Sequence, residues 1–249
     1  MSIKRELSPA ERLIVAADFK PDKKEVIQGK VMALAADLKG TGVSVKVESA
    51  LRICGYELID KIHQMGVPCF ADLKLVGTRH TLGLDGAFLR RYHPEIVTVS
   101  CAVGVKALAV LKHELPDTEV LGVTVLTSLD EDDVQHINRG SVLEVVMHFA
   151  QMALDAGLDG LISAPAEVCQ LRRTFGRSLS INTPDIRPAW VVIEDDDQNP
   201  KRVMTPTEAM KADIDRIVVG RPIVESKNPY DAVMSIIEEI DAAMAPIEL

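Results

Sequence analysis

An aspartate and a lysine stand two residues apart in the apolar segment CFADLKL, residues 69–75. If this segment is a strand, Asp72 and Lys74 project from the same face, because strand side chains alternate with a period of two. Burying a charge is unfavourable unless an opposite charge pairs with it. An acid and a base held side by side at the end of a buried strand therefore suit catalysis or the binding of a charged ligand.

Three more charged residues lie near the ends of earlier apolar segments. Asp18 closes the segment RLIVAADF, and Lys46 and Glu48 share one face of the segment VSVKVE. If these segments are neighbouring strands, Lys46, Asp72 and Lys74 can form a chain of alternating charges in which each stabilises the next. The alternative is a buried salt-bridge network that only ties the strands together.

A glycine and an arginine close the last apolar segment, RIVVGRPI. Gly220 lets the backbone approach a ligand closely, and Arg221 offers a planar fork of donors that matches phosphate geometry. The pair therefore indicates a phosphate site.

The elements that must position these residues are eight short, nearly continuous apolar runs, as expected for strands covered on both faces. They span residues 12–19, 43–48, 69–75, 96–100, 120–126, 160–164, 179–186 and 216–223. Helical patterns fill most of the gaps. Alternating strands and helices in a chain of this length predict a single (β/α)8 barrel domain over residues 1–249. A doubly wound open sheet is disfavoured because AADFKPDKKE, after the first run, is not a glycine-rich phosphate turn.

Two helix starts carry capping signals. Ser141 precedes Glu144 by three residues, and Thr205 precedes Glu208 in the same way, with Pro206 in the first turn. Both are capping boxes, which predict helix N-termini at these positions. In a (β/α)8 barrel, chemistry lies at the carboxyl ends of the strands, and phosphate often binds after strands seven and eight. The charged residues and Arg221 fall at those places.

Bulk composition excludes several classes of protein. The net charge is −9 and the isoelectric point is about 5.2, which argues against a nucleic-acid partner. No apolar stretch is of signal-peptide or membrane-spanning type. The four cysteines are far apart, without a CxxC pair, and are expected to be buried reduced thiols of a cytoplasmic protein.

Four motifs in this order, ADLKL, VTVLTSL, INTPDIRP and RIVVGRPI, resemble the orotidine 5′-phosphate decarboxylase family. The resemblance covers essentially the whole chain. It implies a homodimeric (β/α)8 barrel that removes CO2 from orotidine monophosphate to give UMP. It also implies that the reaction uses neither a metal nor an organic cofactor.

The same resemblance implies a role for each site residue. Lys74 would deliver a proton to C6 as CO2 leaves, beside Asp72 and Lys46. The implied substrate-binding residues are Asp18 at the ribose, Thr81 at the ribose of the neighbouring subunit's ligand, Ser128 and Pro184 at the base, and Gln198, Gly220 and Arg221 at the phosphate.

One departure from the family pattern falls at the candidate site. The family motif D-x-K-x-x-D places a third charge at position 77, where this chain has Gly77. In the family that acid enters the partner subunit's site and flanks the catalytic lysine. We therefore expect Asp72 alone to pair Lys74, and turnover to be weakened.

Two other functions stay open. The chain could be a non-catalytic or altered-substrate barrel that binds a nucleotide or sugar phosphate. It could also be a metal-dependent sugar-phosphate decarboxylase or aldolase, which would carry a metal-binding glutamate on the second strand. Lys46 argues against that reading, and Glu48 on the same face keeps it open.

Overall fold

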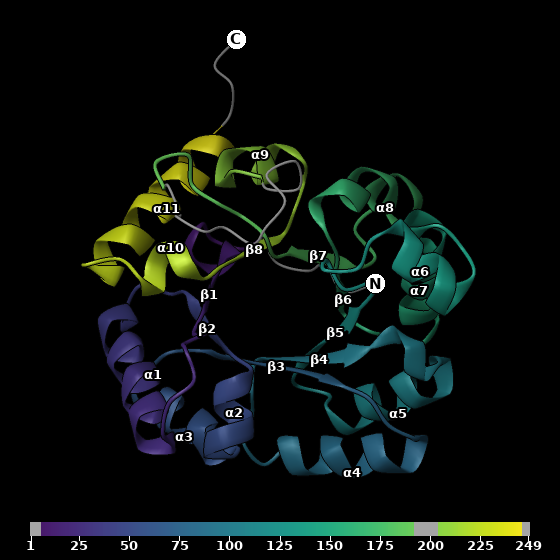
Figure 1. Cartoon of the computed structure of the whole chain (residues 1–249), viewed down its shortest axis with the longest axis horizontal. Helices are drawn as coiled ribbons and strands as arrows, with labels where there is room; N and C mark the ends of the chain where they lie inside the picture. Colours follow the sequence, from purple (N-terminus) through teal and green to yellow (C-terminus); the bar gives the residue numbers. More distant parts are fainter. Residues whose placement is uncertain (1–5, 192–203, 246–249) are drawn as a thin grey trace.

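Eight parallel strands close into a barrel in the order of the sequence, with helices around the outside (Figure 1). The computed structural model describes residues 6–191 and 204–245. The strands are β1 (Leu13–Ala16), β2 (Ser44–Val47), β3 (Cys69–Leu75), β4 (Ile96–Ser100), β5 (Glu119–Val123), β6 (Gly160–Ile162), β7 (Ser180–Thr183) and β8 (Arg216–Val219). Pairing of β8 with β1 completes the ring. The predicted (β/α)8 barrel is confirmed.

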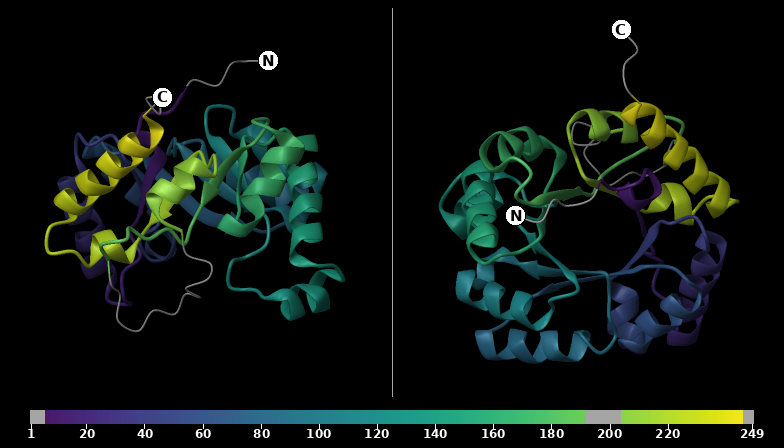
Figure 2. Two further views of the ribbon diagram at one scale, coloured as in Figure 1. Left: turned by 90° about the horizontal axis from the view of Figure 1, so that it is seen from above. Right: turned by 180° about the vertical axis from the view of Figure 1, so that it is seen from behind.

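The helices form a layer that surrounds the strands, as the views from above and behind also show (Figure 2). They are α1 (Lys24–Leu38), α2 (Ser49–Cys54), α3 (Glu57–Gln64), α4 (Arg79–Leu89), α5 (Val105–Glu114), α6 (Glu131–Asn138), α7 (Val142–Asp155), α8 (Val168–Phe175), α9 (Pro206–Lys211), α10 (Arg221–Val224) and α11 (Pro229–Met244). Both predicted capping boxes are present, at the starts of α7 and α9. No helix within residues 6–191 and 204–245 is long and apolar enough to cross a membrane.

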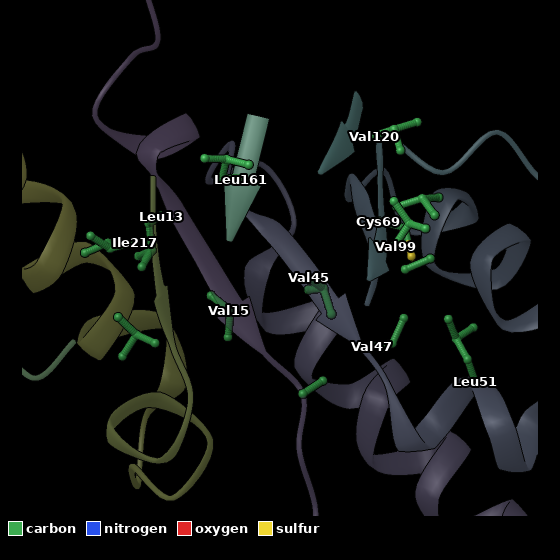
Figure 3. Close-up of a cluster of buried hydrophobic side chains, with 14 of the residues drawn as sticks. Leu13, Val15, Val45, Val47, Leu51, Cys69, Val99, Val120, Leu161 and Ile217 are labelled. Atoms are coloured by element: carbon green, nitrogen blue, oxygen red, sulfur yellow. The ribbon is translucent and has the colours of Figure 1, made fainter. Parts of the chain in front are cut away.

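The hydrophobic core has two layers. A small cluster fills the inside of the barrel and consists of Ile14, Ala16, Phe70, Ile96, Leu121 and Val218. A much larger cluster lies between the strands and the surrounding helices, where Val45, Val47 and Leu51 pack together (Figure 3). Each strand therefore buries both of its faces, which explains why the apolar runs are nearly continuous in the sequence.

The amino-terminal end of the barrel carries a salt bridge across its interior. The Arg216 guanidinium, at the start of β8, donates to both carboxylate oxygens of Glu119, at the start of β5, over 2.7 and 2.9 Å. It also donates to Asn182 Oδ1 over 3.3 Å. This network ties strands together far from the opposite rim, where the candidate site residues lie.

The cysteines follow the expectation with one exception. Cys54, Cys69 and Cys101 are buried free thiols, but Cys169, in α8, is exposed. The prediction that all four are buried is therefore wrong for Cys169, which lies on the solvent side of its helix.

Strand β3 departs from regular geometry at its carboxyl end. The pairing register with β4 shifts between Ala71 and Leu75, and Lys74 has a φ angle of +47°. The Lys74 amide donates to Thr98 Oγ1 in β4 over 2.9 Å instead of to a backbone carbonyl. This irregularity holds Lys74 at the barrel mouth.

Candidate active site

The carboxyl ends of the strands surround a cavity of about 570 Å³. Its lining includes Asp18, Lys46, Glu48, Asp72, Lys74, Pro184, Gly220 and Arg221. The two lysines and two aspartates that the sequence placed at one barrel mouth share this cavity, and Glu48 joins them as a third carboxylate. These five charged side chains lie at the carboxyl-terminal rim of the barrel, which is where (β/α)8 barrels carry their active sites.

Asp72 is at the centre of the charge network and is only 7% exposed. Its Oδ2 lies 3.2 Å from Lys46 Nζ and 2.9 Å from Lys74 Nζ. Its Oδ1 accepts a hydrogen bond of 2.8 Å from Thr98 Oγ1. Burial alone would raise the pKa of this carboxyl, but the two ammonium groups and the hydrogen bonds outweigh burial and lower it. Asp72 is therefore an anion at neutral pH.

Lys46 is equally buried and faces carboxylates on two sides. Its Nζ lies 3.1 Å from Asp18 Oδ2, in addition to its contact with Asp72. Burial disfavours the charged form, but Asp72, Asp18 and Glu48 together raise the pKa of Lys46 above its usual value. Lys46 is therefore a fixed cation inside the barrel mouth, and it helps to hold Asp72 in place.

The expectation that Asp72 alone pairs Lys74 is wrong. Glu48 Oε2 lies 2.8 Å from Lys74 Nζ, in addition to the 2.9 Å contact of this ammonium with Asp72 Oδ2. Glu48 lies directly beyond β2, and the irregular end of β3 brings Lys74 within its reach. A second carboxylate of the same chain thus completes the pairing.

A second group of cationic side chains lines the cavity. Arg221 begins α10, directly after Gly220, and both follow β8. Lys20 and Arg187 also contribute to the lining. Gly220 and Arg221 lie at the end of the eighth strand and line the cavity, and their role at a phosphate stays a prediction. Guanidinium and ammonium groups are the side chains that pair with phosphate, so Arg221, Lys20 and Arg187 are candidate phosphate ligands.

Two of the predicted substrate-binding residues, Thr81 and Ser128, do not line the cavity. Thr81 is exposed in the first turn of α4, where its hydroxyl lies 3.1 Å from that of Thr78. Ser128 is exposed, and its neighbour Thr127 lines the cavity in its place. Gln198 lies outside the described residues. The cavity of one chain therefore contains neither Thr81 nor Ser128.

Thr98 was not among the predicted site residues, and Glu48 was considered only as a possible metal ligand on the second strand. Thr98 is fully buried and orders both Asp72 and the Lys74 backbone. Its signal was available, since Thr98 is the polar residue two positions after the inward-facing Ile96. Glu48 shares a face with Lys46, but its contact with Lys74 depends on the shape of β3. No pattern in β2 alone predicts that contact.

Metal-ligand geometry is not found in the described parts of the chain. Within residues 6–191 and 204–245, no group of three or more His, Cys, Asp or Glu side chains is arranged to hold an ion. The carboxylates of Asp18, Glu48 and Asp72 each contact a lysine ammonium instead.

A family model and individual relatives of known sequence point to the same family. The family model described as Orotidine 5′-phosphate decarboxylase / HUMPS family matches residues 11–236. The chain belongs to this family. An orotidine 5′-phosphate decarboxylase of Bradyrhizobium diazoefficiens is 35% identical over 242 residues, which cover 96% of this chain and 98% of the relative. One of Syntrophomonas wolfei is 30% identical over 244 residues, which cover 93% and 98%.

A solved structure extends the comparison to three dimensions. The crystal structure of orotidine 5′-phosphate decarboxylase from Lactobacillus acidophilus aligns with a TM-score of 0.78 and 29% identity, covering 93% of this chain and 99% of that one. The orotidine 5′-phosphate decarboxylase / HUMPS match runs from before β1 into α11. It therefore includes every charged residue of the cavity.

Proposed function

We propose that this chain decarboxylates orotidine 5′-monophosphate to UMP, a step of pyrimidine biosynthesis. One observation carries the proposal, namely the Lys46–Asp72–Lys74 network at the mouth of the barrel. Membership of the family and the names of its relatives agree with it. A network that only tied strands together would not need to line a cavity, whereas these three side chains do.

In the proposed reaction, Lys74 donates a proton and Asp72 contacts the carboxylate group of the substrate. As the bond between C6 and the carboxyl carbon breaks, its electron pair stays on C6 and CO2 leaves. Lys74 donates a proton from Nζ to C6, so that UMP forms and the neutral amine regains a proton from solvent. Asp72 lies against the substrate carboxylate, and Lys46 fixes Asp72. Cations held in place before the reaction stabilise the developing negative charge.

The remaining residues are proposed to bind the nucleotide. Gly220 and Arg221 hold the phosphate, together with Gln198, and Asp18 holds the ribose. Ser128 and Pro184 contact the base. The support is that Arg221, Lys20 and Arg187 line the same cavity as the lysine and carboxylate network. Binding energy from a phosphate remote from C6 can help to order the reacting groups.

Arg221→Ala should weaken the binding of UMP by about 2–3 kcal/mol, because one charge-assisted pairing with the phosphate is lost. Isothermal titration calorimetry with UMP measures the change. Arg173→Ala is a matched control, since Arg173 lies in the last turn of α8 and does not line the cavity. Unchanged affinity in the Arg221 variant would contradict the phosphate assignment.

We also propose that the protein is a homodimer in which Thr81 reaches the neighbouring subunit's ligand. Support comes from large apolar side chains exposed around Thr81, with Val76 75%, Leu84 48% and Phe88 54% exposed. Such a patch on and before α4 suits an interface between subunits. Sedimentation at micromolar concentration should therefore give a dimer, and a monomer there would contradict the proposal.

An ultraviolet assay with purified protein and orotidine monophosphate tests the proposed activity. Conversion to UMP in the absence of added Mg²⁺ supports it. Turnover only with Mg²⁺ would favour the metal-dependent alternative, and UMP binding without turnover would favour a non-catalytic barrel. The weakened turnover expected from Gly77 stays a prediction that the same assay addresses.

A further inference from the structure

We infer that Glu48 is a positioning residue that holds the Lys74 ammonium from within the same chain, in place of an acid at position 77. The inference rests on the proposed decarboxylation and deepens it. It concerns what fixes Lys74, the proposed proton donor, when Gly77 offers no side chain.

Two carboxylates contact the Lys74 ammonium group. Its Nζ lies 2.8 Å from Glu48 Oε2 and 2.9 Å from Asp72 Oδ2, so a carboxylate just beyond β2 and one within β3 bind the same ammonium. An ammonium group has three donors. Within residues 6–191 and 204–245 the ammonium contacts these two carboxylates, so a third donor can act within the cavity that Lys74 lines.

Glu48 is itself held at both ends of its carboxylate. Oε1 lies 3.2 Å from Arg52 Nη2, four residues along the chain, and Oε2 lies 3.7 Å from Lys46 Nζ. The backbone is fixed as well, because the Glu48 carbonyl accepts from the Leu51 amide over 3.0 Å at the start of α2. The side chain is 24% exposed. Glu48 is therefore restrained where it meets Lys74, rather than free in solvent.

A second carboxylate matters because a lysine side chain is long and flexible. The four-carbon stem of Lys74 can place its ammonium in many positions, and the side chain is 30% exposed. A single partner, Asp72, would leave rotation about the stem open. Two partners define the position of Nζ, and catalysis by a positioned group is sensitive to displacements of about 1 Å.

Position 77 offers no carboxylate to the Lys74 ammonium of either subunit. Gly77 has no side chain, and the adjacent Val76 is strongly exposed. A Cβ at position 77 would lie 3.1 Å from both Cβ and Cγ2 of Thr81, so an acid there would require Thr81 to shift. Glu48, directly beyond β2, supplies the carboxylate instead. The five charges of the network then all come from one chain, between Asp18 and Lys74.

Glu48→Gln keeps the shape of the side chain and removes its charge. We expect kcat for orotidine monophosphate to fall about 10²-fold, the effect of a misplaced reacting group, while KM and the Kd of UMP change less than about threefold. Glu48→Asp, which keeps the carboxylate, should retain more activity than Glu48→Gln. Glu238→Gln, at an exposed site on α11, is the control and should behave as wild type.

The outcomes separate this inference from the proposed function. Full kcat in Glu48→Gln, with an active wild type, would overturn the role of Glu48 and leave the proposed function intact. Equal losses of kcat and UMP affinity, or a Glu48→Asp variant no better than Glu48→Gln, would also overturn it. An inactive wild type would reject both.

Discussion

Lys74→Ala should abolish measurable decarboxylation of orotidine monophosphate. The variant lacks the proposed proton donor, and loss of a positioned general acid alone lowers rates by about 10²–10⁴-fold. The cation that stabilises the developing charge is lost with it. UMP binding should persist, because the cationic lining that includes Arg221 is untouched. The ultraviolet assay measures turnover, and calorimetry measures binding of UMP.

Lys106→Ala is the matched control, since Lys106 is an exposed lysine on α5 outside the cavity. It should retain wild-type turnover. If Lys74→Ala turned over substrate at the wild-type rate, Lys74 would not be the proton donor. The network would then have only a role in holding β2 and β3 together.

Asp72→Asn should reduce both activity and stability. The substitution keeps the shape of the side chain but removes the charge that Lys46 and Lys74 share. Removing one partner of a buried ion pair commonly destabilises a protein by about 3–5 kcal/mol. Asp18 and Glu48 still face Lys46 in this variant, so the buried ammonium keeps two partners. We therefore expect the free energy of unfolding to fall by about 3 kcal/mol, the lower end of that range. Turnover should fall about 10²–10³-fold.

The difference in stability between wild type and Asp72→Asn should decrease as the pH is lowered. Because folding lowers the pKa of Asp72, its contribution is fully present above the unfolded value of about 4. It is lost as the pH falls through the lower folded value. Urea unfolding should therefore separate wild type from Asp72→Asn at pH 7, and the difference should shrink progressively as the pH falls below about 4. Equal stability at pH 7 would contradict the assigned pairing.

The barrel could be predicted from the sequence because its signals are local. The bounds of β3 and β4 match the apolar runs at 69–75 and 96–100, and capping boxes mark the starts of α7 and α9. The other six strands are shorter than their runs. Strand pairing ends before the apolar run does, and residues beyond the strand ends, such as Asp18 and Thr127, line the cavity.

The details of the site could not be predicted in the same way. The contact between Glu48 and Lys74 requires the register shift in β3, which reflects pairing with β4 rather than any pattern within β3. Ser128 lies outside the cavity because the loop after β5 directs Thr127 inward instead. The role proposed for Thr81 depends on a second subunit. A sequence pattern for one chain does not describe that arrangement.

The φ angle of +47° at Lys74 has a consequence for the balance between stability and activity. A residue with a side chain is less stable in this left-handed region by roughly 1–2 kcal/mol, whereas glycine adopts it readily. Glycine at position 74 would therefore relieve conformational strain that lysine and alanine both retain. The residue proposed to donate the proton is thus also a position where the fold gives up stability to keep a functional side chain.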